Sequence, residues 1–258
     1  MSLIRVEHDG PLAILSIDSP PLNLFDQALM DELSDTVTAL EADPPRGLLI
    51  RADGRVVSGG VDVHVFHGLS TEAASAMWVR LLDLIHTIEQ LPLPTIFAAH
   101  SLCLTAAFEL SLGCDILLAA ESARFGLVET VVGLTPAMGG TQRLAERAGP
   151  ARARELVMTG ELYDATTLER WNVVNRVLPD EGFDTAAHAF ARNLAEGPTR
   201  AHAATKAIVR AQLDRGGAHG ADERVPELAG NLFATEDLKR AVTTFLECGP
   251  GHAIYEGR

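Results

Sequence analysis

The chain has 258 residues, 47% of them hydrophobic, and its 35 acidic against 21 basic residues give a formal net charge of −14. This charge repels nucleic acid and anionic membrane surfaces, so we expect neither as a partner. The cysteines, Cys103, Cys114 and Cys248, form no closely spaced pair, which argues against a disulfide framework or a structural zinc site.

The chain opens with a predicted β-hairpin, in which residues 3–7 and 12–18 flank an Asp9-Gly10 turn. A helix is predicted over residues 26–41 and a strand over residues 46–51. No apolar run has the length of a signal-peptide core or a membrane span, so we expect a cytoplasmic protein.

The middle of the chain alternates between helical and extended patterns. Over residues 71–91 apolar positions recur every three or four residues, which predicts an amphipathic helix that ends before Pro92. Strands are then predicted over residues 95–99 and 115–120, and helices over residues 105–112, 140–147 and 151–159. Their alternation predicts an α/β fold.

The last part of the chain is predicted to be helical. A strand over residues 173–178 is the last extended pattern, and the later helices are predicted over residues 199–213, 223–233 and 237–247. We divide the chain into a domain of residues 1–197 and a C-terminal helical region of residues 198–258. The glycine-rich residues 215–220 are predicted to form a mobile loop.

An ionisable side chain lies within an apolar helix. Residues 104–112 read LTAAFELSL, so this helix should be buried while it carries Glu109. Burial of an unpaired carboxylate is unfavourable and raises its pKa, which makes Glu109 a candidate for proton transfer. The alternatives are that it pairs with an arginine or points to solvent.

A second carboxylate has similar surroundings. Glu129 lies in the run RFGLVETVVGLTP, although it could also be an ordinary loop residue. Two carboxylates in a dry site can hold a water molecule, with one donating a proton while the other accepts one. Hydration of a conjugated double bond needs that arrangement.

The Gly59-Gly60 pair allows the backbone to approach a ligand closely, and the N–H groups that follow it can stabilise a developing oxyanion. The alternative is a plain tight turn. His64 and His67 follow in an HxxH pattern without a third ligand, so we predict no metal site.

Two stretches, DGRVVSGGVDV and HSLCLTAAFELSLGCDILLAAESARFGLVETVVGLTPAMGGTQRL, resemble in order and spacing the signature segments of the crotonase (enoyl-CoA hydratase/isomerase) superfamily. The resemblance implies an α/β spiral of repeated ββα units, followed by C-terminal helices that pack the subunits into a homotrimer or a hexamer. It also implies an acyl-CoA thioester as the substrate, with no separate cofactor because coenzyme A is part of that substrate.

The resemblance also assigns site residues. The backbone N–H groups of the oxyanion hole fall on Val61 and Ala106, and the two catalytic carboxylates of hydratases fall on Glu109 and Glu129. Both carboxylates together favour a hydratase, because relatives that only shift double bonds rely on the glutamate that matches Glu129. Further substrate contacts are expected at Gly60, Asp62, His64 and Phe66. Phe245 matches a family aromatic residue that contacts the CoA of a neighbouring subunit.

The chain departs from the family pattern at two places. Thr105-Ala106-Ala107 stands where many hydratases have a glycine triplet, and its methyl groups narrow the approach of the thioester. Cys248 stands where a lysine that contacts phosphate is common. Other basic residues are then candidates to hold the CoA phosphates: Arg51, Arg55, Lys206 and Arg240.

The resulting hypothesis is an enoyl-CoA hydratase that adds water across the 2,3 double bond of a 2-enoyl-CoA to give a 3-hydroxyacyl-CoA. One alternative is a double-bond isomerase that needs only Glu129. Others are decarboxylation or thioester hydrolysis of a specialised acyl-CoA, and a non-catalytic RNA-binding relative, against which the net charge argues.

Overall fold

The computed structural model describes residues 2–258, and the predicted hairpin opens its main sheet. Strands β1 (Ile4–Asp9) and β2 (Leu12–Ile17) pair antiparallel. The sheet continues in parallel through β3 (Gly47–Ala52), β4 (Thr95–Ala99), β6 (Ile116–Ala120) and β9 (Arg176–Leu178), in the order β1-β2-β3-β4-β6-β9. Strands β2 and β4 are buried along their whole length, as strands covered on both faces should be.

Two predicted helices link the first parallel strands. Helix α1 (Gln27–Ala42) connects β2 to β3, and α2 (Thr71–Gln90) connects β3 to β4. Each begins at a side-chain cap, because Asp26 accepts a hydrogen bond from the Leu29 N–H group and Ser70 accepts one from Ala73. The buried face of α2 is the predicted apolar one: Met77, Leu81, Leu84, Ile85 and Ile88.

The sequence patterns do not predict the second sheet, in which β5 (Leu102–Leu104) pairs parallel with β7 (Arg124–Gly126), and β7 pairs antiparallel with β8 (Tyr163–Asp164). These strands have only two or three residues, too few for an alternating pattern to be visible. Only Thr105 separates β5 from helix α3 (Ala106–Leu112), so the small sheet positions the start of this helix.

The predicted strand over residues 173–178 is wrong in its first half. The N–H groups of Val173 and Val174 both donate to the Leu168 carbonyl, which closes the end of α6 (Ala165–Arg170) and makes strand pairing there impossible. The remaining elements between β3 and the C-terminal helices are η1 (Val63–Phe66), η2 (Glu129–Val132), α4 (Gly140–Ala148), α5 (Pro150–Thr159) and α7 (Phe183–Ala195).

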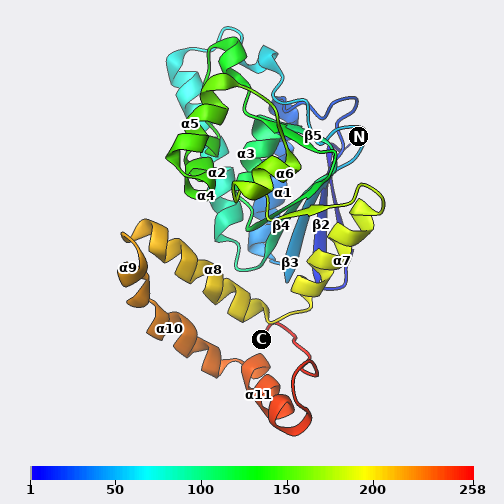
Figure 1. Cartoon of the computed structure of the whole chain (residues 1–258), viewed down its shortest axis with the longest axis vertical. Helices are drawn as coiled ribbons and strands as arrows, with labels where there is room; N and C mark the ends of the chain where they lie inside the picture. Colours follow the sequence, from blue (N-terminus) through cyan, green and yellow to red (C-terminus); the bar gives the residue numbers. More distant parts are fainter. Residues whose placement is uncertain (1) are drawn as a thin grey trace.

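The C-terminal helices extend away from the two sheets (Figure 1). They are α8 (Thr199–Asp214), α9 (Ala218–Asp222), α10 (Val225–Gly230), η3 (Asn231–Ala234) and α11 (Glu236–Cys248). The predicted loop over residues 215–220 is shorter than expected, since α9 begins at Ala218. No helix within residues 2–258 is both long and apolar enough to cross a membrane.

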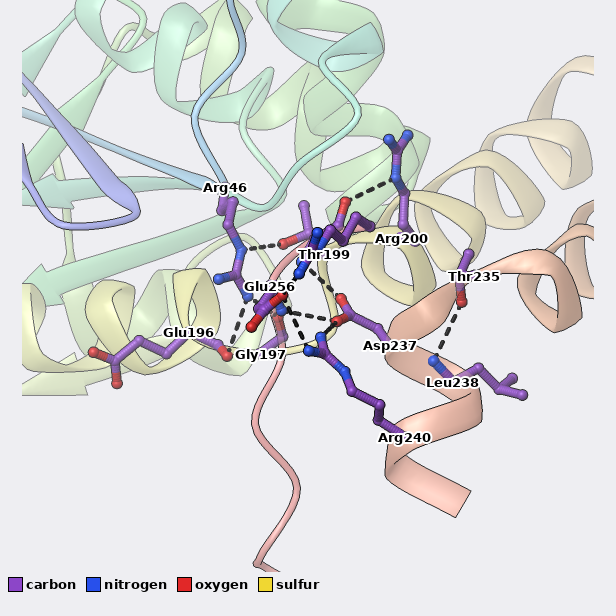
Figure 2. A network of polar contacts seen from close by, with 12 residues as sticks. Arg46, Glu196, Gly197, Thr199, Arg200, Thr235, Asp237, Leu238, Arg240 and Glu256 are labelled. Carbon is purple, nitrogen blue, oxygen red and sulfur yellow. Dashed lines mark hydrogen bonds and ion pairs between the residues drawn. The ribbon is translucent and has the colours of Figure 1, made fainter. Parts of the chain in front are cut away.

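The last residues fold back onto the first turn of α11 and form what we call the C-terminal clasp: Asp237, Arg240, Glu256 and Gly257. Figure 2 shows Asp237, Arg240 and Glu256 side by side. The Asp237 carboxylate accepts hydrogen bonds from the N–H groups of Glu256 and Gly257, at 2.8 and 2.7 Å. It also pairs with Arg240 at 2.7 Å. The Arg200 side chain from α8 donates to the Gly257 carbonyl, so the clasp ties the tail to two helices.

Candidate active site

A cavity of about 210 Å³ is bordered by the loop after β3, α2, the start of α3 and the segment around η2. Polar side chains in its lining come from Thr105, Glu109, Glu129 and Thr135. Most of the other lining residues are apolar: Met30, Val61, Val63, Phe66, Met77, Trp78, Leu81, Ala106, Val128, Val131, Val132, Leu134, Ala137 and Met138. The two carboxylates singled out from the sequence therefore face one apolar cavity.

Glu109 is held by backbone groups from a distant segment. Its side chain is buried, and Oε2 accepts hydrogen bonds from the N–H groups of Met138 at 2.9 Å and Gly140 at 2.7 Å. Within residues 2–258 it forms no ion pair, because Arg143 instead makes two 2.6 Å hydrogen bonds to Glu89. The structure thus contradicts both alternatives for Glu109, an arginine partner and a solvent-facing side chain.

Both carboxyl groups have raised pKa values. Burial raises the pKa of Glu109 to about 8; the Gly140 N–H group opposes this shift, and the nearby charge of Glu129 adds to it. Burial also raises the pKa of Glu129, the first residue of η2, to about 7. The Oε2 atom of Glu129 is buried and has no hydrogen-bond partner within residues 2–258. One protonated and one ionised carboxyl group can therefore coexist near neutral pH.

Gly140 allows the close contact with Glu109. A Cβ atom at this residue would lie 2.6 Å from Cγ of Glu109 and 2.9 Å from its Oε2. The preceding turn is braced by Arg143, which donates to the Gly139 carbonyl. The sequence patterns did not predict the N–H donors of Met138 and Gly140.

Two backbone N–H groups at the cavity are free. Val61 and Ala106 both line the cavity, and within residues 2–258 neither N–H group donates a hydrogen bond. The Phe25 N–H group donates to the Gly60 carbonyl, and the Asp62 N–H group donates to the Phe25 carbonyl. The N–H group of Val61, which lies between Gly60 and Asp62, takes no part in this pairing. These are the two groups that the sequence resemblance assigned to an oxyanion hole.

Thr105 has an unusual backbone conformation beside these groups. Its φ of 46° and ψ of −118° are those of the first central residue of a type II′ turn, a place that glycine normally fills. For a β-branched residue this conformation is strained, by about 1–3 kcal/mol. Its Oγ1 atom is buried and has no hydrogen-bond partner within residues 2–258.

The other predicted substrate contacts are dispersed. Phe66 lines the cavity and packs against Trp78, with ring centroids 5.8 Å apart. Gly60 is not itself a lining residue, and it packs against the side chain of Thr105. Asp62 caps η1 and contacts His64 Nδ1 at 2.6 Å, while the His64 side chain is 89% exposed.

Neither Asp62 nor His64 belongs to the cavity lining. Phe245 does not line it either, and is exposed on α11.

The basic residues considered for CoA phosphates differ in their availability. Lys206 Nζ is bound to Asp115 at 2.8 Å and to backbone carbonyls, and Arg240 belongs to the C-terminal clasp. Arg51 donates to the Ser16 hydroxyl. Arg55 is exposed and makes no ion pair in the described part of the chain.

The chain is similar to proteins of one family over nearly its whole length. Residues 7–253 match the family described as enoyl-CoA hydratase/isomerase. A crotonyl-CoA hydratase of Syntrophomonas wolfei is 32% identical over 251 residues, which cover 95% of each chain. A short-chain-enoyl-CoA hydratase of Clostridium acetobutylicum is 29% identical over 249 residues, 95% of this chain and 94% of that one.

A crystal structure of an enoyl-CoA hydratase from Bacillus anthracis has the same fold. It superimposes with a TM-score of 0.91 at 26% identity, and the match covers 99% of this chain and 100% of that one.

Proposed function

The chain belongs to the enoyl-CoA hydratase/isomerase (crotonase) family, and from that premise we propose that it hydrates 2-enoyl-CoA thioesters to 3-hydroxyacyl-CoA. One observation carries the proposal: Glu109 and Glu129, with pKa values of about 8 and about 7, share a cavity with the free N–H groups of Val61 and Ala106. The two carboxyl groups supply the proton transfers, and the two N–H groups supply electrostatic stabilisation.

In the proposed mechanism the thioester oxygen accepts hydrogen bonds from Val61 and Ala106. Negative charge builds up on this oxygen when water attacks the β-carbon, so these bonds are stronger in the transition state than in the bound substrate. Loss of one such donor typically raises the barrier by about 3 kcal/mol.

The carboxyl groups complete the reaction. Glu109 binds the water and takes one of its protons while the oxygen bonds to the β-carbon, and Glu129 gives a proton to the α-carbon. Hydration is reversible, so each group must gain and lose a proton readily. Near-equal pKa values close to neutral pH suit that requirement.

The lining of the cavity supports a hydrocarbon acyl chain. Beyond the two glutamates, polar side chains in the lining come only from Thr105 and Thr135 among residues 2–258. A carboxylated or strongly polar acyl group would lose its hydration there without gaining hydrogen bonds.

The test is to incubate the purified protein with 2-enoyl-CoA esters of increasing chain length and follow the loss of the conjugated thioester absorbance. Glu109→Gln and Glu129→Gln serve as controls, and both should abolish the loss. An isomerase would instead keep its double-bond shift in the Glu109→Gln variant. No reaction with any ester would contradict hydration and favour decarboxylation or thioester hydrolysis.

We also propose that residues 198–258 assemble the subunits into a trimer or a hexamer. Support comes from large apolar side chains that these helices expose in the single chain: Val209, Leu213, Phe233, Val242, Phe245 and Leu246. Exposed apolar residues in such number are typical of an interface. A monomeric mass in light scattering would contradict this assembly.

A further inference from the structure

We propose that the hydroxyl group of Thr105 is a third hydrogen-bond donor to the thioester oxygen, beside the N–H groups of Val61 and Ala106. The inference rests on the proposed function, since it assumes that an acyl-CoA thioester occupies the cavity. It assigns a chemical role to a residue that stands where many relatives have glycine.

The first observation is a buried hydroxyl group without a partner. Thr105 is 6% exposed and lines the cavity, and its Oγ1 atom makes no hydrogen bond within residues 2–258. Buried polar atoms in folded proteins almost always have a partner, and an unpaired one destabilises the fold. A partner that arrives with the substrate accounts for this atom.

The second observation is the direction of the side chain. With ψ at −118°, the Cβ atom of Thr105 eclipses the backbone nitrogen of Ala106. The N–H bond of a trans peptide lies on the same side as the preceding Cα atom. The side chain of Thr105 therefore runs alongside the free N–H group of Ala106.

The third observation places the hydroxyl near the opposite loop. A Cβ atom built on Gly60 would lie 2.8 Å from Oγ1 of Thr105, and Gly60 directly precedes Val61, which carries the other free N–H group. The hydroxyl thus lies between the two segments that contribute the N–H donors. Gly60, with its φ of +108°, leaves space for it.

The strained backbone favours a chemical role over a packing role. Glycine would adopt the Thr105 conformation without strain and would leave no unpaired hydroxyl group. When a thioester becomes an enolate, its oxygen gains negative charge and accepts an additional hydrogen bond more strongly. A third donor therefore stabilises the enolate more than the bound substrate.

The experiment uses acetoacetyl-CoA, because its bound enolate absorbs in the near ultraviolet and forms without any hydration step. The enolate fraction is measured for the wild type and for Thr105→Val, Thr105→Ser and Thr105→Gly. Valine keeps the shape and removes the donor, serine keeps the donor, and glycine removes both the donor and the strain. The unfolding temperature of each variant is measured in parallel.

We expect the ratio of enolate to keto form to fall about tenfold or more in Thr105→Val and Thr105→Gly, and to stay within about threefold in Thr105→Ser. Thr105→Gly should unfold at a higher temperature than the wild type while it loses the enolate, a combination that a purely structural role would not produce. Because the glycine variant relieves strain, it provides a folded test even where the valine variant is unstable.

A wild-type enolate fraction in both Thr105→Val and Thr105→Gly would overturn the inference, as would a wild-type protein that stabilises no enolate. The proposed function is tested separately. If no 2-enoyl-CoA is hydrated but the enolate still depends on the Thr105 hydroxyl, the hydratase proposal fails and this inference stands.

Discussion

The pKa values of two buried carboxyl groups in this protein are shifted in opposite directions. Glu109 in the cavity and Asp237 in the C-terminal clasp are both 3% exposed, and each accepts two backbone N–H hydrogen bonds. Burial opposes ionisation of Asp237, but the N–H groups and Arg240 together lower its pKa. Within residues 2–258 Glu109 contacts no cation, and it lies near Glu129, so burial prevails and its pKa rises to about 8.

The buried carboxylate of the clasp stabilises the fold, whereas the buried carboxylate of the cavity is kept reactive. In the clasp the charge is neutralised by Arg240, and the group stays ionised and holds the tail. In the cavity, Oε2 of Glu129 and Oγ1 of Thr105 have no hydrogen-bond partner in the described part of the chain. Unpaired groups weaken the fold but remain available to a substrate.

The largest expected effect comes from removing the carboxyl group of Glu109, which takes a proton from the attacking water in the proposed mechanism. Glu109→Gln keeps the side-chain shape and can still accept the two N–H bonds, but it cannot transfer a proton. We expect hydration to fall by about 10²–10⁴-fold, with no loss of stability, because a buried ionisable group is replaced by a neutral one. Steady-state rates with a 2-enoyl-CoA and urea unfolding check both parts. A rate within tenfold of wild type would contradict the role of Glu109.

In the clasp the corresponding change should act on stability. Asp237→Asn can accept only one of the two backbone N–H bonds, and the other N–H group loses its partner, so we expect a loss of about 1–3 kcal/mol in the free energy of unfolding. Glu236→Gln, one residue earlier, removes an exposed pair with Lys239 and should leave the unfolding midpoint close to that of the wild type. Equal unfolding midpoints for the two variants would show that the clasp contributes no more than a surface pair.

A smaller effect is expected where the backbone approaches Glu109. In Gly140→Ala the new methyl group overlaps the Glu109 side chain and must displace it, so we expect hydration to fall about tenfold. Gly230→Ala is the matched control, because a Cβ atom there meets no atom within 4 Å and its φ of −60° suits alanine. If the two variants were equally active, the position of Glu109 would not depend on Gly140.

The effects of pH are small for each unit of pH, and they have opposite signs in the two regions. The folded-state pKa of Glu109 is raised from 4.5 to about 8, so its contribution to stability is present below pH 4.5 and is lost as the pH rises to about 8. The pKa of Asp237 is lowered from 3.8, so its contribution is lost as the pH falls below that value. Each slope is at most about 1.4 kcal/mol per pH unit for one proton.

Unfolding measured from pH 3 to 9 in wild type, Glu109→Gln and Asp237→Asn checks these signs. In Glu109→Gln the free energy of unfolding should decline less between pH 4.5 and 8 than in the wild type. In Asp237→Asn it should decline less at acid pH. The rate of hydration should be highest between the pKa values of about 7 and about 8 and fall on either side. A rate that keeps rising up to pH 9 would contradict an acidic member of the pair.

Much of the main sheet and its helices follows from local patterns. The opening hairpin and α2 are confirmed, because a turn signal and a long helical period are visible within a single window. The turn lies one residue later than predicted, at Gly10-Pro11, because Asp9 still pairs with Leu12. The small sheet is not predicted, since its strands are two or three residues long. Residues 173 and 174 are apolar because they are buried in the core, and not because they form a strand.

The candidate site was only partly visible in the sequence. Glu109 and Glu129 could be found because a charged residue in an apolar run is conspicuous, and the structure places both at one cavity. The N–H donors that hold Glu109 lie 29 and 31 residues away, and nothing in the local sequence connects them. Asp62 and His64 follow the glycine pair in sequence, yet neither belongs to the cavity lining.

The sequence by itself determined which groups are available: carboxyl groups in apolar segments, a glycine pair before Val61, and helices with one apolar face. These are properties of residue type and period, which need no knowledge of distant contacts. Only the tertiary structure decided that Glu109 has a pKa of about 8 while Asp237 stays ionised, and that Thr105 is strained beside two free N–H groups. Desolvation and charge interactions depend on distances between segments far apart in the chain, which no local pattern specifies.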